Sequence, residues 1–359
     1  MKPLLIVNDV HLGVSRVAGT TPASATALKR YLQNAFSDLI IGNKDKDLLI
    51  LGDLFDSFTV ESGEVLQTYN TLMSWMLVSG NKLTLVPGNH DWSAKGDRTS
   101  SFHLLAEVLL AQFGDRVQVC KPEFTRLGNN LYAVPHCANQ DLFELELARA
   151  AVAPPGFLLL HCNVMNGFAD RSDHSLNLTQ EWCETLTKKH FIMVAHEHQW
   201  RVLNMNKGLV VLGNQFPSSV SDCMDKSSQE GAKFAYVIEG TDKTGYEYNA
   251  MRTWWADQDG AGYSEVDWQD LPGAKAKFIR AVGHATASQA VDVISTIAKF
   301  RGRSDAFIVT NAVEVEGMEN MEGIGSACLD QIQSFDVLQA LLDLLNEKER
   351  TVIQGILND

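Results

Sequence analysis

The sequence predicts an α/β fold, because short apolar runs alternate with segments of helical periodicity through the first 120 residues. These runs are continuously apolar, which is typical of strands that are buried on both faces of a sheet. Polar residues follow each run at once, as in α/β proteins that bind ligands beyond the carboxyl ends of their strands. The runs span residues 4–7, 48–51, 83–86, 157–160 and 191–195, and residues 209–212 and 234–238 add further strands.

Helices are expected between the first strands, because apolar side chains recur there every three or four positions. The segments 27–40, 65–76 and 102–113 follow this spacing. Ser24 precedes the first of them and is of a residue type that caps helix N-termini. Strand, helix, strand is therefore the expected order of elements through residue 120.

The second half of the chain predicts a smaller domain after the large catalytic domain of residues 1–253. Residues 254–274 are acidic and contain Gly and Trp, which indicates a linker. Strand, helix and strand patterns at 277–282, 288–300 and 306–315 then predict a small α/β cap over 275–318. A Gly- and Glu-rich flexible segment is expected at 319–334, and two short amphipathic C-terminal helices at 335–359.

Composition excludes several classes of protein. The 359 residues are 45% hydrophobic and 21% charged, ordinary values for a soluble globular protein, and no apolar run approaches the length of a membrane span. The six cysteines form no C-x-x-C pair, which argues against a disulfide framework and favours a reducing cytoplasm. A net charge of −14 disfavours a protein that holds nucleic acid mainly by its own surface, although bound divalent cations would offset part of it.

Five polar clusters follow the expected strands. Taken singly each is weak, because a lone histidine after a strand is more often structural and a Gly-Asn-His-Asp sequence also suits a simple turn. Taken together they predict one site, where carboxylate, amide and imidazole groups suit a pair of Mn, Fe or Zn ions better than Mg. The clusters are Asp9-Val10-His11, Gly52-Asp53, Gly88-Asn89-His90-Asp91, His161 and His196-Glu197-His198.

The order D-x-H, G-D, G-N-H-D, H and H-x-H resembles the calcineurin-like metallophosphoesterase superfamily over residues 1–240. Ala195 replaces a Gly that is usual in this family, a change that a methyl group should allow. The resemblance implies a two-sheet sandwich with flanking helices and two divalent metal ions, for which Mn²⁺ is expected. It implies one ion held by Asp9, His11 and His198, a second held by Asn89, His161 and His196, and Asp53 bridging both.

The same resemblance implies roles for residues around the metals. His90 matches the catalytic histidine that is not a ligand, and we expect it to stabilise or protonate the leaving oxygen. Asp91 is expected to orient His90 or another imidazole. Asp56 either supports the site in the same way or stabilises its turn.

Three motifs resemble DNA-cutting members of the superfamily. D-V-H-L-G at 9–13 and G-D-L-F-D at 52–56 are similar to the opening motifs of SbcD-type exonuclease subunits. H-C-N-V-M-N-G-F at 161–168 is similar to the fourth motif of the tailed-phage recombination endonuclease subunit. This resemblance implies a DNA exo/endonuclease that forms a homodimer and binds a coiled-coil ABC-type ATPase, as in an SbcCD-like repair complex. It would act in the cytoplasm, or in the host cytoplasm if phage-encoded.

Two surface features allow alternative interpretations. Leu338, Leu342 and Leu345 either pack on the chain's own cap or bind the ATPase partner. Basic side chains of the cap either contact DNA phosphates or form an ordinary solvated surface. The basic residues are Lys275, Lys277, Arg280, Lys299, Arg301 and Arg303.

Three functions therefore compete. A DNA nuclease is the first, and a small-molecule (nucleotide) phosphodiesterase or phosphatase is the second, which the acidic net charge favours. The third is a non-catalytic scaffold, which the complete set of expected ligands disfavours.

Overall fold

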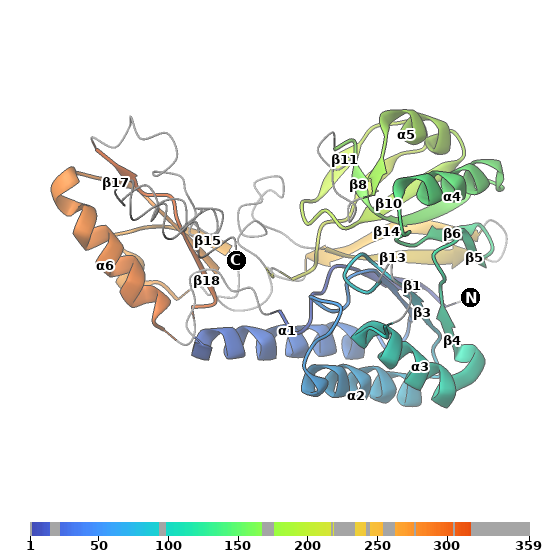
Figure 1. Cartoon of the computed structure of the whole chain (residues 1–359), viewed down its shortest axis with the longest axis horizontal. Helices are drawn as coiled ribbons and strands as arrows, with labels where there is room; N and C mark the ends of the chain where they lie inside the picture. The colour runs from blue at the N-terminus through green and yellow to red at the C-terminus, as the bar shows by residue number, and fades with distance from the viewer. Residues whose placement is uncertain are drawn as a thin grey trace, which may run out of the picture.

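The computed structural model describes residues 2–14, 22–92, 98–166, 176–216, 218, 234–241, 245–253, 263–275, 278–303 and 306–316. Two six-stranded sheets face each other, and helices cover their outer faces (Figure 1). This arrangement confirms the expected α/β fold and the two-sheet sandwich. None of the helices in these ranges is long and apolar enough to cross a membrane.

The first sheet has a parallel half and an antiparallel edge, in the order β14-β13-β1-β2-β3-β4. Helices α1 (Pro22–Gly42), α2 (Ser62–Ser79) and α3 (Ser101–Phe113) pack on its outer face. Its strands are β1 (Leu4–Val7), β2 (Asp47–Leu51), β3 (Leu83–Val86), β4 (Val117–Val119), β13 (Phe234–Thr241) and β14 (Gly245–Thr253).

The second sheet has the order β11-β12-β10-β7-β6-β5, and its central strands β6, β7, β10 and β12 are parallel. Helices α4 (Gln140–Val152) and α5 (Gln180–Thr187) pack on its outer face. The strands are β5 (Thr125–Gly128), β6 (Leu131–Val134), β7 (Gly156–His161), β10 (His190–Ala195), β11 (Arg201–Leu203) and β12 (Leu209–Val211), and a separate pair is formed by β8 (Asn163–Val164) and β9 (Asn177–Leu178).

The strands are continuously apolar because each sheet is covered on both of its faces. In β1, Leu5 and Val7 belong to the core beneath the helices. Leu4 and Ile6 belong to the core between the two sheets. Successive side chains of a strand point to opposite faces, so a strand covered on both faces has no position at which a polar side chain would be solvated.

The first helix begins earlier than the expected capping residue. It starts at Pro22, so Ser24 lies in its first turn rather than ahead of it. Proline suits this position because its fixed φ is helical and the missing N–H has no partner in a first turn.

A three-stranded parallel sheet, in the order β15-β16-β18, forms the cap with α6 (Ala290–Arg301). The strands β16 (Phe278–Val282) and β18 (Ile308–Asn311) were expected, whereas β15 (Tyr263–Asp267) lies in the range 254–274 that was expected to be a linker. The short strands β17 (His284–Ala285) and β19 (Glu314–Val315) also pair. The predictions for 319–334 and 335–359 lie outside the described residues.

Three aromatic side chains join the cap to the catalytic domain. The ring of Tyr31, on α1, lies 6.0 Å from that of Phe278 and 5.3 Å from that of Phe307. Both phenylalanines are buried in the core that α1 forms with the first sheet. Helix α1 runs antiparallel to β1 and β2, so its beginning and the carboxyl ends of these strands lie at the same end of the sandwich. The cap therefore docks on α1, whose beginning lies on the side of the sandwich that faces the cap (Figure 1).

The four cysteines within the described ranges are expected to resist thiol reagents while the protein is folded. Burial raises the pKa of Cys120 and Cys137 to about 12 and that of Cys183 to about 11, and it raises the pKa of Cys162 well above its usual range. Only the thiolate reacts, so none of the four should react at neutral pH.

The measurement is a thiol titration with an aromatic disulfide, made on a variant in which serine replaces Cys223 and Cys328. We expect no reaction in buffer and release of all four equivalents in denaturant. Rapid reaction of any thiol in the folded protein would contradict the expected burial.

Candidate metal centre

Both sheets direct the carboxyl ends of their parallel strands to one rim, where all five clusters converge. The first sheet contributes the residues that follow β1, β2 and β3, and the second contributes the end of β7 and the residues that follow β10. Side chains from these two groups of strands lie in direct contact there. The expected ligands at the rim are Asp9, His11, Asp53, Asn89, His161, His196 and His198.

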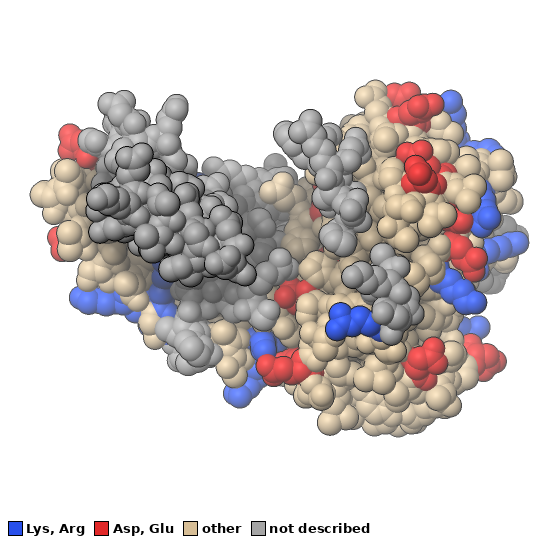
Figure 2. Space-filling view, in the orientation of Figure 1, with Lys and Arg blue, Asp and Glu red and all other residues tan. Residues whose placement is uncertain are grey.

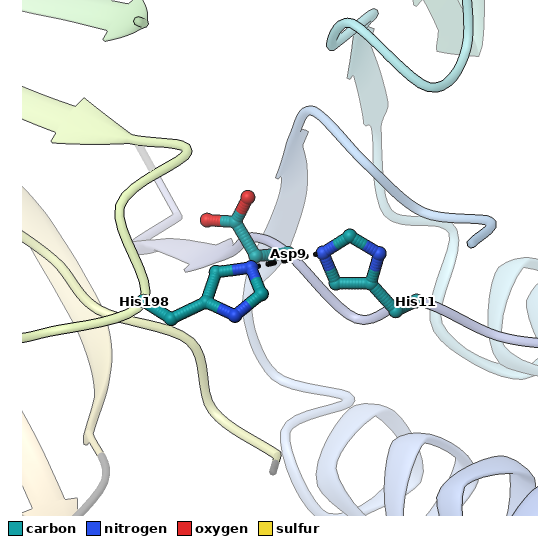
Figure 3. A group of neighbouring side chains, drawn as sticks. All are labelled: Asp9, His11 and His198. Carbon is teal, nitrogen blue, oxygen red and sulfur yellow. Dashed lines mark hydrogen bonds between the residues drawn. The ribbon is translucent and has the colours of Figure 1, made fainter. Parts of the chain in front are cut away.

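Asp9, His11 and His198 form one compact group of potential ligands (Figure 3). One ligand atom from each lies within 4.8 Å of the others, and His11 Nε2 is 3.0 Å from His198 Nε2. Two imidazole nitrogens bound at right angles to one cation, each about 2.1 Å from it, would be about 3.0 Å apart. The group therefore has the spacing of ligands around a shared cation.

A second group is formed by Asp53, His161 and His196, with Asn89 in contact with both imidazoles. Asn89 Oδ1 lies 3.0 Å from His161 Nε2 and 2.9 Å from His196 Nδ1. His161 Nε2 is also 3.4 Å from Asp53 Oδ2. This is the set that was expected to hold the second ion, and it supplies two nitrogens and two kinds of oxygen.

Asp53 faces both groups. Its Oδ2 lies 3.4 Å from His161 Nε2 on one side and 4.0 Å from His11 Nε2 on the other. Its Oδ1 accepts a hydrogen bond of 3.0 Å from the backbone N–H of His90, which fixes the carboxylate between the groups. This placement matches the bridging role that the resemblance implies.

The backbone around the rim is tightly constrained. Asp9, His11, Asp53 and His196 have φ values of 47°, 52°, 49° and 95°, in the left-handed region that non-glycine residues rarely adopt. Hydrogen bonds from Asp9 N to Gly52 O (3.1 Å) and from His11 N to Asp53 O (3.0 Å) hold two of them. Such strained residues concentrate at functional sites, where the surrounding fold maintains them.

His90 is oriented by Asp56 rather than by Asp91. Its Nδ1 contacts the carbonyl oxygen of Asp56, and its Nε2 lies 3.9 Å from Asp53 Oδ2. The Asp56 carboxylate is also 3.3 Å from His11 Nδ1, so Asp56 contacts two imidazoles of the rim. The Asp91 Oδ2 atom instead accepts hydrogen bonds from the backbone N–H groups of Asp53 (2.9 Å) and Gly88 (3.0 Å). Asp91 thus holds the ends of β2 and β3 together.

The electrostatics of the rim favour a bound cation. Burial alone would raise the pKa of Asp53, but the nearby His161, His11 and His90 hold it well below its usual range. Burial would lower the pKa of His161, but the Asp53 carboxylate raises it to about 9. Burial, and then the Asp53 charge, raise the pKa of Asp91 to about 7. The buried Asp53 carboxylate therefore needs adjacent positive charge, which a divalent cation would supply.

Two further observations agree with a cation at this rim. Burial, and then His161, lower the pKa of His196 to about 4, so its imidazole is neutral and able to bind a metal at neutral pH. Asp9 Oδ1 is buried and has no hydrogen-bond partner among the described residues. A buried carboxylate oxygen without a partner is costly unless a cation binds it. The residues present therefore fit a two-metal site.

The cap arginines, for which DNA contact and an ordinary solvated surface were both considered, form hydrogen bonds within the cap itself. Arg280 Nη1 lies 3.0 Å from Glu265 Oε1, Arg301 donates to Val309 O, and Arg303 donates to Ala274 O. Lys275 and Lys299 are exposed, and Lys277 lies outside the described residues. On the face drawn in Figure 2, basic and acidic side chains alternate over the described part of the catalytic domain, without a continuous basic surface.

Sequence reasoning missed two buried amides beside the rim, Asn8 and Gln215. Asn8 immediately precedes Asp9, and Gln215 follows β12 in a short polar segment after a buried strand. That arrangement of strand and polar residues is the same signal that identified the five clusters. This pattern could have indicated from the sequence that Asn8 and Gln215 also lie beside the rim.

Solved structures that are similar to this chain include two described as phosphatase or phosphoesterase. A dimetal phosphatase from Danio rerio is similar over 70% of this chain and 99% of its own, with 11% identity and a TM-score of 0.38. The calcineurin-like phosphoesterase YfkN from Bacillus subtilis is similar over 70% of this chain and 90% of the other, with 11% identity and a TM-score of 0.29. No curated protein sequence matches the chain.

The family model described as calcineurin-like phosphoesterase matches residues 2–307. This range contains every residue of the two ligand groups and of the two sheets that position them. The chain therefore belongs to the calcineurin-like phosphoesterase family.

Proposed function

We propose that this phosphoesterase is a Mn-dependent phosphodiesterase that cuts DNA as an exo/endonuclease. The observation that carries the hydrolytic part of the proposal is the pair of ligand groups that share Asp53, with the ring of His90 beside them. Each group supplies two imidazole nitrogens, which favours Mn, Fe or Zn over Mg. Among these we propose Mn²⁺.

The two cations would polarise phosphoryl oxygens and lower the pKa of the attacking water. Because they activate the water, no separate carboxylate base is required. The task left to the protein is to stabilise the leaving oxygen, which we assign to His90. Its Nδ1 is occupied by the Asp56 carbonyl, so Nε2 is the atom presented to the site, where it lies 3.9 Å from Asp53 Oδ2.

DNA is proposed as the substrate because of the nuclease-like motifs at 9–13, 52–56 and 161–168 and because of the cap. The cap docks on α1, and the beginning of α1 lies on the side of the sandwich that faces the cap, so we propose that a long substrate meets it. The net charge of −14 and the hydrogen-bonded cap arginines disfavour strong phosphate binding by this chain alone. A partner should therefore supply most of the DNA binding, and we propose that it is a coiled-coil ABC-type ATPase. The two proteins would form an SbcCD-like cytoplasmic complex in which the nuclease is a homodimer.

A small nucleotide is the second candidate substrate, favoured by the same negative charge and by the lack of a continuous basic surface in the part of the catalytic domain drawn in Figure 2. This alternative keeps the two-metal chemistry and removes the need for a partner. A non-catalytic scaffold is disfavoured, because the ligand groups and His90 are all in place.

In the test, the protein is incubated with Mn²⁺ and either end-labelled duplex DNA or a small chromogenic phosphodiester. Wild type and His90→Ala are compared on both substrates. Degradation of DNA by wild type alone would support the nuclease proposal. Turnover of the small diester with DNA untouched, even with the ATPase partner present, would replace it with a nucleotide phosphodiesterase.

Deletion of residues 335–359 is expected to abolish binding to the ATPase partner while Mn-dependent phosphodiesterase activity remains. The Leu338, Leu342 and Leu345 stripe suits a helix that packs on a partner. A pull-down with the ATPase and a diester assay on the same preparation measure both properties. Loss of both would show that these residues stabilise the chain itself.

A further inference from the structure

Two amide side chains behind Asp9 form a buried hydrogen-bonded pair. Asn8 and Gln215 are 207 positions apart in the sequence, and both are fully buried. Gln215 Oε1 accepts from the backbone N–H of Asn8 at 2.8 Å, and Gln215 Nε2 donates to Asn8 Oδ1 at 2.7 Å. Gln215 Nε2 also donates to the carbonyl oxygen of Phe234 at 3.0 Å. Both polar atoms of the Gln215 side chain are thereby occupied.

This pairing fixes which way the Asn8 amide faces. Because Asn8 Oδ1 accepts from Gln215, its Nδ2 is turned towards Asp9 and Gly213. Nδ2 donates to Asp9 Oδ2 at 2.6 Å and to the carbonyl oxygen of Gly213 at 2.7 Å. A flipped amide would place an oxygen against each of these acceptors. Gln215 therefore determines that Asn8 presents a donor, not an acceptor, to Asp9.

The two oxygens of Asp9 are consequently unequal. Oδ2 accepts from Asn8 Nδ2 and, at 3.0 Å, from the backbone N–H of His196. Oδ1 is buried, and no residue in the described part of the chain forms a hydrogen bond with it. The protein thus engages one oxygen and leaves the other for a cation held with His11 and His198.

We propose that Asn8 and Gln215 are positioning residues that set the affinity of the Asp9–His11–His198 group for its cation. This inference rests on the proposed two-metal function and adds residues outside the two ligand groups. The hydrogen bond from His196 N joins the same carboxylate to the second group, so the pair also fixes the two groups relative to each other. Partners that orient a ligand in this way commonly change metal affinity by about 10–100-fold when they are removed.

The test uses Gln215→Glu and Gln215→Met in the full-length chain. In Gln215→Glu the side chain keeps its shape, but an oxygen replaces the donor to Asn8 Oδ1, so the Asn8 amide is expected to flip away from Asp9. Gln215→Met removes both interactions without adding charge. Gln33→Met is the matched control, because Gln33 is also buried and hydrogen-bonded but connects α1 to α2, away from the rim.

Mn²⁺ binding is measured by the electron paramagnetic resonance signal of the free ion, and folding by thermal denaturation. Both Gln215 variants are expected to bind one of two Mn²⁺ ions at least tenfold more weakly. The Mn²⁺ concentration for half-maximal diester hydrolysis should rise equally, while the rate at saturating Mn²⁺ stays near that of wild type. Gln33→Met should lower the unfolding temperature but leave the Mn²⁺ midpoint unchanged.

Folded Gln215 variants with the Mn²⁺ affinity of wild type would overturn the inference and leave only a structural role for the pair. If Gln215→Met fails to fold, Gln215→Glu and Asn8→Asp provide the same comparison, since each preserves shape. Failure of the wild type itself to bind two Mn²⁺ ions would instead contradict the proposed function.

Discussion

His90→Ala is expected to bind both Mn²⁺ ions and to lose turnover by about 10²–10⁴-fold, the range over which a positioned acid or base contributes to a reaction. The imidazole is removed, but the hydrogen bond to Asp53 Oδ1 is donated by the backbone N–H of residue 90 and survives the substitution. The geometry of both ligand groups should therefore persist. Metal analysis and the initial rate of diester hydrolysis measure the two properties on one preparation.

Asp53→Asn is the matched comparison, because it preserves the shape of the side chain and removes its charge. Asp53 lies within reach of imidazoles from both groups, so the variant should bind fewer than two Mn²⁺ ions and lose activity as well. A His90→Ala protein with a near-normal rate would show that His90 is not the group that acts on the leaving oxygen. An Asp53→Asn protein that binds two ions normally would contradict the bridging position.

Gly88→Ala is expected to disrupt the centre although it adds only one methyl group. A Cβ at residue 88 would lie 2.2 Å from Asp53 Oδ1, 2.6 Å from Asp53 N and 2.8 Å from His161 Cε1. The nearest backbone atom cannot move without displacing the end of β2, and the two side-chain atoms belong to expected metal ligands. We expect loss of Mn²⁺ binding and a destabilisation of about 1–3 kcal/mol, as is typical of overpacking.

Gly63→Ala is the control for this substitution. Residue 63 lies in the first turn of α2, and a Cβ there would meet no atom within 4 Å. Alanine in place of a helical glycine should stabilise the protein by about 0.5–1 kcal/mol and leave Mn²⁺ binding unchanged. Urea denaturation and metal titration of both variants give the result. If Gly88→Ala bound Mn²⁺ as tightly as Gly63→Ala, the rim would be able to accommodate the added methyl group, which would contradict the prediction.

The layers of the fold were predictable because their signal is local. Runs such as residues 48–51 have no polar position, which a strand tolerates only when both of its faces are covered. The strand β15 was missed for the opposite reason. Its sequence, from Tyr263 to Asp267, lacks the strict alternation of a half-buried strand, because Ser264, Glu265 and Asp267 are all polar. Nothing local therefore distinguished it from an acidic linker.

The supporting contacts of the site could not be predicted, because they depend on how loops from distant segments approach each other. Asp91 and Asp56 both stand within three residues of an expected rim residue, and Asp91 was expected to orient His90 or another imidazole. In the structure the carbonyl oxygen of Asp56 contacts Nδ1 of His90, and the Asp91 carboxylate accepts hydrogen bonds from backbone N–H groups.

The expected ligands could be identified from the sequence, because each ends or follows a buried strand and the carboxyl ends of parallel strands lie at one edge of a sheet. Their orientation required the folded structure, in which Asp53 stands between the two groups and Gln215 turns the amide of Asn8 towards Asp9. The two kinds of information differ in sequence separation. The apolar pattern of a buried strand lies within four or five consecutive residues, whereas the hydrogen bond between Gln215 and Asn8 joins residues that are 207 positions apart.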